Sequence, residues 1–137
     1  IVKGGNYFMH NTGTSSTFLG SLAGTLTNTG DSNCGFGSNA LASISTGIDN
    51  IAIGVNALSQ NTIGNTNVGI GSSALLSNVS SSNNVAIGHI ALTLSTAGSN
   101  TAIGSGAGSQ IVTGTDNVYL GASAGANNVG ANSGNIY

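Results

Sequence analysis

The chain repeats itself about every 17 residues, and this period limits the folds open to it more than any other feature. In each repeat a large apolar residue is followed by a glycine, at spacings of 17, 17, 17, 17, 16 and 17 residues. The single short step lies between Gly98 and Asn100, in a segment that resembles a turn in the other copies. Such self-similarity indicates a stack of equivalent structural units. The anchor glycines are Gly20, Gly37, Gly54, Gly71, Gly88, Gly104 and Gly121.

The residues just before each anchor alternate in size. A large apolar residue stands directly before the glycine, a β-branched residue usually stands three before it, and a small residue usually separates them. This period-2 pattern predicts a short strand with one large-residue face. We expect that face to form the structural core. Its columns are Ile51, Ile53, Val68, Ile70, Val85, Ile87, Ile103 and Leu120.

An asparagine stands four residues before nearly every anchor. Asn tolerates left-handed backbone in turns, and stacked copies can hydrogen-bond into a ladder. We expect these residues to turn the chain, to form a ladder, or both. The column consists of Asn33, Asn50, Asn67, Asn84, Asn100 and Asn117.

Each repeat thus predicts two short strands and two tight corners, because Gly and Asn interrupt every candidate helix. Seventeen residues suit one coil of a β-solenoid, or β-roll, whose coils pair at about 4.8 Å. We expect an all-β solenoid of about seven such coils, roughly 35 Å long. Residues 1–15 are expected to be a lead-in or partial coil, residues 16–131 the array, and residues 132–137 the start of a further coil.

The composition excludes several partners. Charged residues make up 3% of the chain, and the net charge of -2 comes from Lys3 and three aspartates. Nucleic acid and anionic lipid both require clustered Lys or Arg, so neither is expected as a partner. No run approaches the roughly 18 apolar residues of a membrane span. With one cysteine, Cys34, no disulfide forms within the chain.

A single coil this thin does not bury both faces of its strands, and the ends of a solenoid expose unpaired strand edges. We therefore expect a parallel homotrimer in which equivalent columns meet around the axis, with end-to-end association in a longer fibre as a further possibility. The competing interpretation is a monomeric solenoid with one apolar face.

The motifs NIAIG, NVGIG, NVAIG and NTAIG, each followed by xxAL or xxAG, resemble the head repeats of trimeric autotransporter adhesins. Those repeats form left-handed β-rolls and are nearer fourteen residues long. The longer segments STFLGSLAG, STGIDNIAIGVNAL and TGTDNVYLGASAG are similar to Asn/Gly-rich repeats of bacteria, phages and large viruses. In that family such arrays often belong to fibre proteins with a C-terminal endosialidase-type intramolecular chaperone. The resemblance implies a fibre or adhesin segment.

Candidate chemistry is sparse, and no catalytic, cofactor-binding or metal-binding residues are predicted. His89 is either an exposed substitution or one member of a histidine ring around a trimer axis that binds a metal or an anion. Cys34 shares a column with Val68 and is expected to be a small core residue. The aspartates suit turn capping better than calcium binding, which requires several per coil. Asn78 begins a formal glycosylation sequon.

Most aromatic residues cluster towards the two ends of the array, where they either plug the core or stack on sugar rings. The possible recognition residues are His89 and Tyr119. The aromatic residues considered are Tyr7, Phe8, Phe18, Phe36, Tyr119 and Tyr137.

The sequence favours a non-enzymatic structural role: a rigid segment of a trimeric extracellular fibre, filament or adhesin stalk, at a cell or virion surface. The alternative is a head module that binds a host receptor or glycan. A third hypothesis is an ice-binding solenoid, although no column carries a uniform threonine array.

Overall fold

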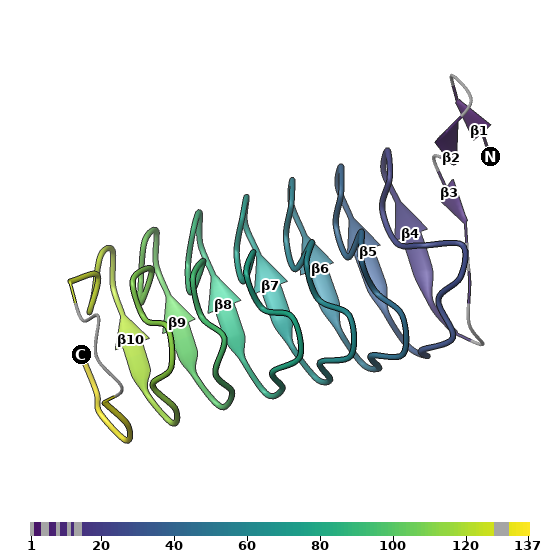
Figure 1. Cartoon of the computed structure of the whole chain (residues 1–137). Helices are drawn as coiled ribbons and strands as arrows, with labels where there is room; N and C mark the ends of the chain where they lie inside the picture. The colour runs from purple at the N-terminus through teal and green to yellow at the C-terminus, as the bar shows by residue number, and fades with distance from the viewer. Residues whose placement is uncertain (1, 4–5, 8, 11, 13–14, 128–131) are drawn as a thin grey trace.

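The computed structural model describes residues 2–3, 6–7, 9–10, 12, 15–127 and 132–137. The described chain forms a parallel β-solenoid of about six turns, each about 17 residues long. Its strands stack side by side along the length of the molecule, as Figure 1 shows. Neighbouring strands pair in register, so that Ile51 lies between Cys34 and Val68. The all-β solenoid predicted from the repeat is confirmed. Its strands are β4 (Thr17–Leu19), β5 (Cys34–Phe36), β6 (Ile51–Ile53), β7 (Val68–Ile70), β8 (Val85–Ile87), β9 (Thr101–Ile103) and β10 (Val118–Leu120).

The shortened repeat leaves the strand register intact. Val85 pairs with Thr101 one coil later although only 16 residues separate them. The Ser99 amide donates to the Ser82 carbonyl at 3.0 Å, so the lost residue is absorbed in the turn, as its sequence position predicts. After β10, Ile136 bridges to Val118, and the Val118 amide donates to the Asn135 carbonyl at 2.8 Å. Residues 135–137 therefore take the place of the next strand.

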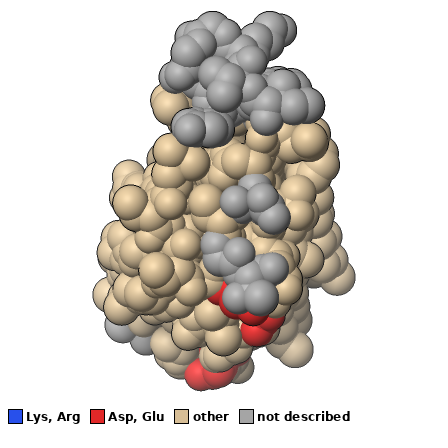
Figure 2. Space-filling view, turned by 90° about the vertical axis from the view of Figure 1, so that its right-hand side faces the viewer, with Lys and Arg blue, Asp and Glu red and all other residues tan. Residues whose placement is uncertain are grey.

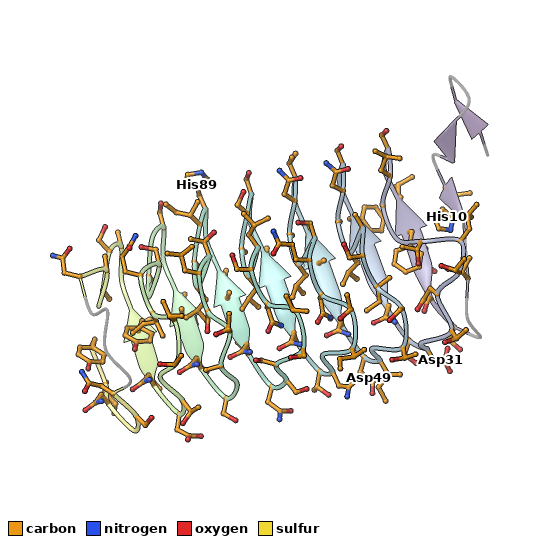
Figure 3. All side chains as sticks on the ribbon, viewed as in Figure 1. His10, Asp31, Asp49 and His89 are labelled. Carbon is orange, nitrogen blue, oxygen red and sulfur yellow. The ribbon has the colours of Figure 1, made fainter. Side chains whose placement is uncertain are left out.

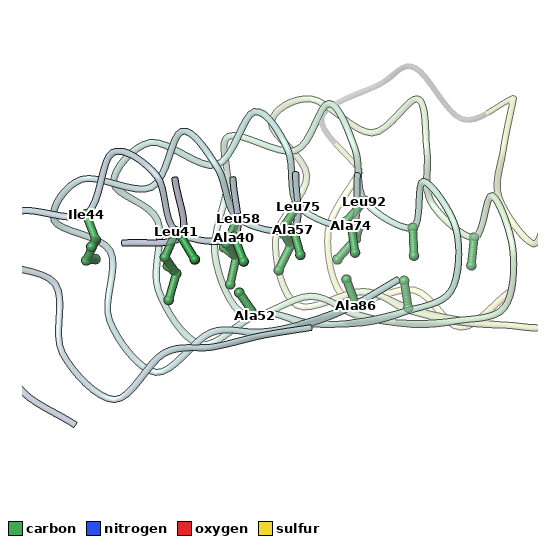
Figure 4. Packing of buried hydrophobic residues seen from close by; sticks show 14 of the residues in the cluster. Ala40, Leu41, Ile44, Ala52, Ala57, Leu58, Ala74, Leu75, Ala86 and Leu92 are labelled. Carbon is green, nitrogen blue, oxygen red and sulfur yellow. The ribbon is translucent and has the colours of Figure 1, made fainter. Parts of the chain in front are cut away.

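The interior is lined by the opposite face of the strands from the one expected. Ala52 is fully buried, whereas its neighbours Ile51 and Ile53 are 39% and 42% exposed. Predicting the large-residue columns as the core of the coil was therefore wrong. The walls of a 17-residue coil lie so close together that an inward strand position holds only a small side chain opposite the leucines of the other wall (Figure 4). The misassigned columns are those of Ile51, Ile53, Val68, Ile70, Val85, Ile87, Ile103 and Leu120, and Cys34 lies with them on the outer face, half-buried.

The opposite wall supplies most of the bulk of the core. An alanine follows each anchor by three residues, and in the four central coils a leucine comes directly after it. In these coils both side chains are buried. The Leu58 side chain reaches beneath Gly69 of the next coil, where a Cβ would lie 3.2 Å away. The leucines with this role are Leu41, Leu58, Leu75 and Leu92.

This second wall is not a strand, contrary to the expectation of two strands per repeat. Its coils still hydrogen-bond to one another, as in the donation from the Leu58 amide to the Ala74 carbonyl at 3.0 Å. Asn56 and Leu58, however, both have left-handed backbone, with φ of 58° and 50°. Left-handed residues two positions apart interrupt the extended conformation that a strand requires. The wall is therefore a column of stacked turns.

The asparagine ladder is confirmed. The Asn67 side-chain amide donates to Asn50 Oδ1 at 3.1 Å and to the Ser81 carbonyl at 2.8 Å, while Asn67 Oδ1 accepts from the Asn84 amide at 3.0 Å. All the side chains of the ladder are buried, and this bonding offsets the cost of burying their polar groups. The left-handed residue of this corner is not the asparagine but the residue before it, such as Asp49 with φ of 58°.

The described part of the lead-in pairs antiparallel to the first strand of the array, unlike the parallel coils that follow. β3 (Met9–His10) lies beside β4, while β1 (Val2–Lys3) and β2 (Asn6–Tyr7) form a separate two-stranded sheet. Figure 2 shows the face at the N-terminal end, where red carboxylates lie toward the lower edge of the view and no other described side chain in view is charged. No helix in the described ranges is long and apolar enough to cross a membrane.

Candidate functional site

The outer face of the seven strands is the most distinctive surface of the molecule, and we call it the strand face. The first and last residues of each strand are exposed or half-buried, whereas the middle residue is buried. The strands β4 to β10 stack side by side (Figure 1) and pair in register, so the outer residues form two columns. Ile53 is 42% exposed, Ile103 is 40% exposed and Leu120 is 67% exposed. One column is Thr17, Cys34, Ile51, Val68, Val85, Thr101 and Val118, and the other is Leu19, Phe36, Ile53, Ile70, Ile87, Ile103 and Leu120.

The strand face is long, narrow and uncharged. Strands at about 4.8 Å give it a length of about 29 Å from first to last strand, and its columns stand about 7 Å apart. Neither column contains a charged residue, and the only polar side chains are those of Thr17 and Thr101. Parallel sheets are normally covered on both faces. Large exposed apolar patches on proteins are common at interaction sites, so the strand face is the candidate functional surface.

The opposite wall has a different character. Ser43, Gln60 and Thr46 are exposed there, and hydroxyl side chains bond the coils to one another. Ser45 Oγ donates to the Thr62 carbonyl at 3.0 Å, and Thr62 Oγ1 donates to the Val79 carbonyl at 3.0 Å. Exposed apolar residues occur outside the strand face, but among the described residues none recurs at the same repeat position in adjacent coils, so they form no continuous column.

No family model, curated protein or solved structure matches the chain. The assignment of the fold as a β-solenoid rests on the pairing of neighbouring coils. The likeness to adhesin and fibre repeats therefore remains an interpretation of the NxAIG motifs.

The two histidines lie far apart along the array, as Figure 3 shows. His89 is exposed in the turn after β8, and His10 stacks on Phe18 with ring centroids 5.2 Å apart. Among the described residues, no three of His, Cys, Asp or Glu lie close enough to hold a metal ion. Asp31 and Asp49 lie in neighbouring turns, where Asp31 Oδ1 accepts from the Ser32 amide at 2.9 Å. That bond agrees with turn capping.

Tyr119, considered above as a recognition residue, is fully buried. Its ring stacks on Tyr137 with centroids 5.0 Å apart and planes 6° from parallel. Its hydroxyl makes no hydrogen bond to the described residues. Burial, together with the nearby Tyr137, raises the pKa of Tyr119 to about 12. The ring therefore plugs the core at the C-terminal end of the array, and a ligand has no access to it.

Phe18 fills the core in the first coil in the same way, whereas Phe36 lies 42% exposed on the strand face. The end-plug interpretation is therefore confirmed for Phe18 and Tyr119 and is wrong for Phe36. Phe8 and the side chain of Tyr7 lie outside the described residues.

The Asn78 sequon is not accessible in the folded chain. Asn78 is fully buried, its side-chain amide donates to the Ser81 carbonyl at 3.0 Å, and its Oδ1 accepts from the Ser81 amide at 3.1 Å. Asn61 makes the same pair of bonds to Gly64 one coil earlier. Sequence analysis missed this second buried asparagine column, although the 17-residue separation of Asn61 and Asn78 is visible in the repeat.

Proposed function

We propose that this chain is a structural segment of a trimeric extracellular fibre, in which three parallel copies bury their strand faces against one another and form a rigid rod. The observation that carries the proposal is the exposed strand face, with Ile53, Ile87 and Ile103 each more than a third exposed. Removing such a strip from water stabilises an assembly by about 25 cal/mol per Å² of apolar area buried.

A second copy suits the strand face because it offers the same periodicity. Every coil presents one residue of each column at the same axial spacing, so a parallel copy aligns side chain with side chain along the whole strip. Equal copies arranged by rotation about one axis form a closed assembly. A strip only two residues wide packs more fully against two neighbours around a three-fold axis than against one neighbour.

The low charge, the coil-to-coil hydrogen bonds and the absence of proline support a structural role. A solenoid whose coils each contact only their neighbours gains length without widening its core. The likeness of the NxAIG motifs to fibre and adhesin repeats supports a place at a cell or virion surface. The proposal assigns the strand face to assembly, which leaves the opposite wall and the turn that contains His89 facing the surroundings.

Cys34 provides the direct test, because it lies on the strand face and is half-buried in the single chain. In a parallel, in-register trimer the three Cys34 thiols stand at one level around the axis. A short bismaleimide should therefore link two chains of each trimer and yield a covalent dimer. An antiparallel or staggered assembly separates the thiols and gives no such product.

The matched control moves the thiol to the opposite wall in a C34S/S43C variant, since Ser43 is exposed there. The proposal predicts cross-linking for the natural chain and none for this variant at the same dilute protein concentration. Equal cross-linking of both, or no cross-linking at Cys34, would reject the parallel trimer.

A further inference from the structure

The first coil differs from all later coils in what lies on its outer edge. In the array, the backbone amide of the first residue of each strand donates to the following coil; the Cys34 amide, for example, donates to the Asn50 carbonyl at 2.8 Å. The backbone groups of successive strand residues point to opposite sides, so the amide of the middle residue faces the preceding coil. Phe18 is the middle residue of β4, and it faces β3, with His10 directly opposite. An antiparallel strand therefore occupies the place of a preceding coil.

The contacts of this lead-in extend around the first coil. On the strand side, the His10 ring stacks on Phe18, and its Nε2 donates to the Ala23 carbonyl at 2.7 Å. On the opposite wall, Thr12 Oγ1 donates to the Thr25 carbonyl at 3.0 Å. At the remaining corner, the Ser15 amide donates to Asp31 Oδ1 at 2.5 Å.

The asparagine ladder also ends here. Asn50 Nδ2 donates to Asn33 Oδ1 at 3.0 Å, but in the first coil the ladder position is Ser16. Ser16 Oγ accepts from the Asn33 amide at 3.0 Å. A serine at this position accepts the bond from the following coil but lacks the amide group that would continue the ladder to a preceding one.

We propose that Met9, His10, Thr12, Ser15 and Ser16 form a cap that closes this end of the solenoid against a second copy of the chain. An open strand edge is a template for further pairing. A copy of this chain is the partner that the edge fits, because its last coil carries the same 17-residue register, anchor-glycine stack and asparagine column. The antiparallel direction of β3 prevents that parallel continuation, so the cap limits end-to-end association and is independent of the strand face.

Hydrogen exchange of the wild-type chain, measured residue by residue, is the first test. The cap predicts that the Phe18 amide is protected to within about tenfold of the Ala52 and Ala86 amides, which lie between two coils. An amide at Phe18 that exchanges as fast as those of the exposed turns would overturn the proposal, and this readout requires no substitution.

The second test opens the cap in the full-length chain. His10→Pro removes the ring contact, the Nε2 bond and the backbone amide opposite Phe18, while H10A/T12V is a milder version that retains the backbone. We expect Phe18 protection to fall about tenfold or more in His10→Pro and less in H10A/T12V. We also expect assemblies whose mass grows with protein concentration in sedimentation velocity.

His89→Ala is the matched control, because it removes the other histidine from an exposed turn far from the cap. It should retain the wild-type mass and Phe18 protection. The cap proposal fails if the Phe18 amide loses its protection in His10→Pro while the mass in sedimentation velocity stays at the wild-type value over a hundredfold concentration range. It also fails if neither cap variant changes Phe18 protection.

Discussion

Phe18 and Gly24 share one space in the core: a Cβ on Gly24 would lie 2.5 Å from the Phe18 ring. Tyr119 and Gly125 stand in the same relationship at the other end of the array. Where the inward strand residue is alanine or glycine, the equivalent position usually carries leucine, as in the Ala52 and Leu58 pair. Six of the seven coils thus place one bulky side chain at this pair of positions, from one wall or the other. The exception is the coil of Ala102 and Gly108, where Leu92 and Tyr119 of the neighbouring coils border the space at Gly108.

This size exchange predicts strong coupling between the two positions. Phe18→Ala alone leaves a cavity and should lower the free energy of unfolding by about 3–5 kcal/mol. Gly24→Leu alone overpacks the same space and should lower it by about 1–3 kcal/mol or more. The double variant recreates the arrangement of the central coils and should lose less than the sum of the single variants. Urea titrations of all four chains measure this difference.

The control for that cycle is Phe18→Ala combined with Leu75→Ala, two core truncations three coils apart. Their effects should add to within about 0.5 kcal/mol, because distant sites are independent. Additive losses in the F18A/G24L cycle as well would show that the two walls do not compensate for each other in size.

The asparagine ladder predicts a pH-dependent variant. Asn67→Asp removes the side-chain donors to Asn50 and Ser81 and buries a carboxyl group. Burial raises the pKa of that carboxyl above its unfolded value, because low dielectric disfavours the charge. The variant should therefore be most stable in acid and lose stability as the pH rises through the raised pKa. Thermal unfolding from pH 3 to 8 should show this trend, and it should be absent from the exposed control Gln60→Asp.

Two anchor glycines separate backbone strain from coil packing. Gly54 has φ of +131°, and a Cβ there would lie 2.7 Å from the backbone of Gly71. Gly121 has φ of +122°, but a Cβ there would meet no atom of the described residues within 4 Å. Gly121→Ala should cost only the conformational strain, about 1–3 kcal/mol. Gly54→Ala must also separate two coils and should lower the melting temperature further. Equal losses would mean that close stacking contributes nothing at this position.

The raised pKa of Tyr119 predicts that the chain loses stability at alkaline pH. Burial, with a contribution from Tyr137, raises its pKa from 10.0 to about 12. Because the pKa of Tyr119 is higher in the folded chain than in the unfolded chain, the contribution of its neutral form to stability is complete below pH 10. That contribution is lost as the pH rises towards 12. Tyr119→Phe should remove this dependence. It should not lower stability at pH 7, because the buried hydroxyl has no partner among the described residues. Unfolding of both chains between pH 8 and 12 tests both statements.

The strand positions, the shortened turn and the asparagine ladder follow from the sequence alone. The anchor glycines set the register, and a 17-residue period fits stacked coils. The location of the interior does not follow from the same pattern. Alternation distinguishes two faces of a strand but does not say which is inside, and large residues such as Ile53 fit a core better in most folds. The paired exchange at Phe18 and Gly24 was the signal that both positions point inward.

The strand face itself predicts where a charge will disrupt assembly. Ile53→Lys should dissociate the oligomer, with its dissociation constant raised about 100-fold or more, because each copy brings a charge to the interface. The chain should keep its β-structure by circular dichroism, since this side chain is 42% exposed without a partner. Ser43→Lys on the opposite wall should leave the mass unchanged. Dissociation by both variants would assign the interface to a different surface.

The mass of the assembled protein tests the central claim, that copies of this chain cover the strand face. Size-exclusion chromatography with light scattering should give three times the chain mass of 13.2 kDa over a wide concentration range. A constant mass of one chain, with the β-structure intact, would contradict the proposed trimer and leave the strand face to a different occupant.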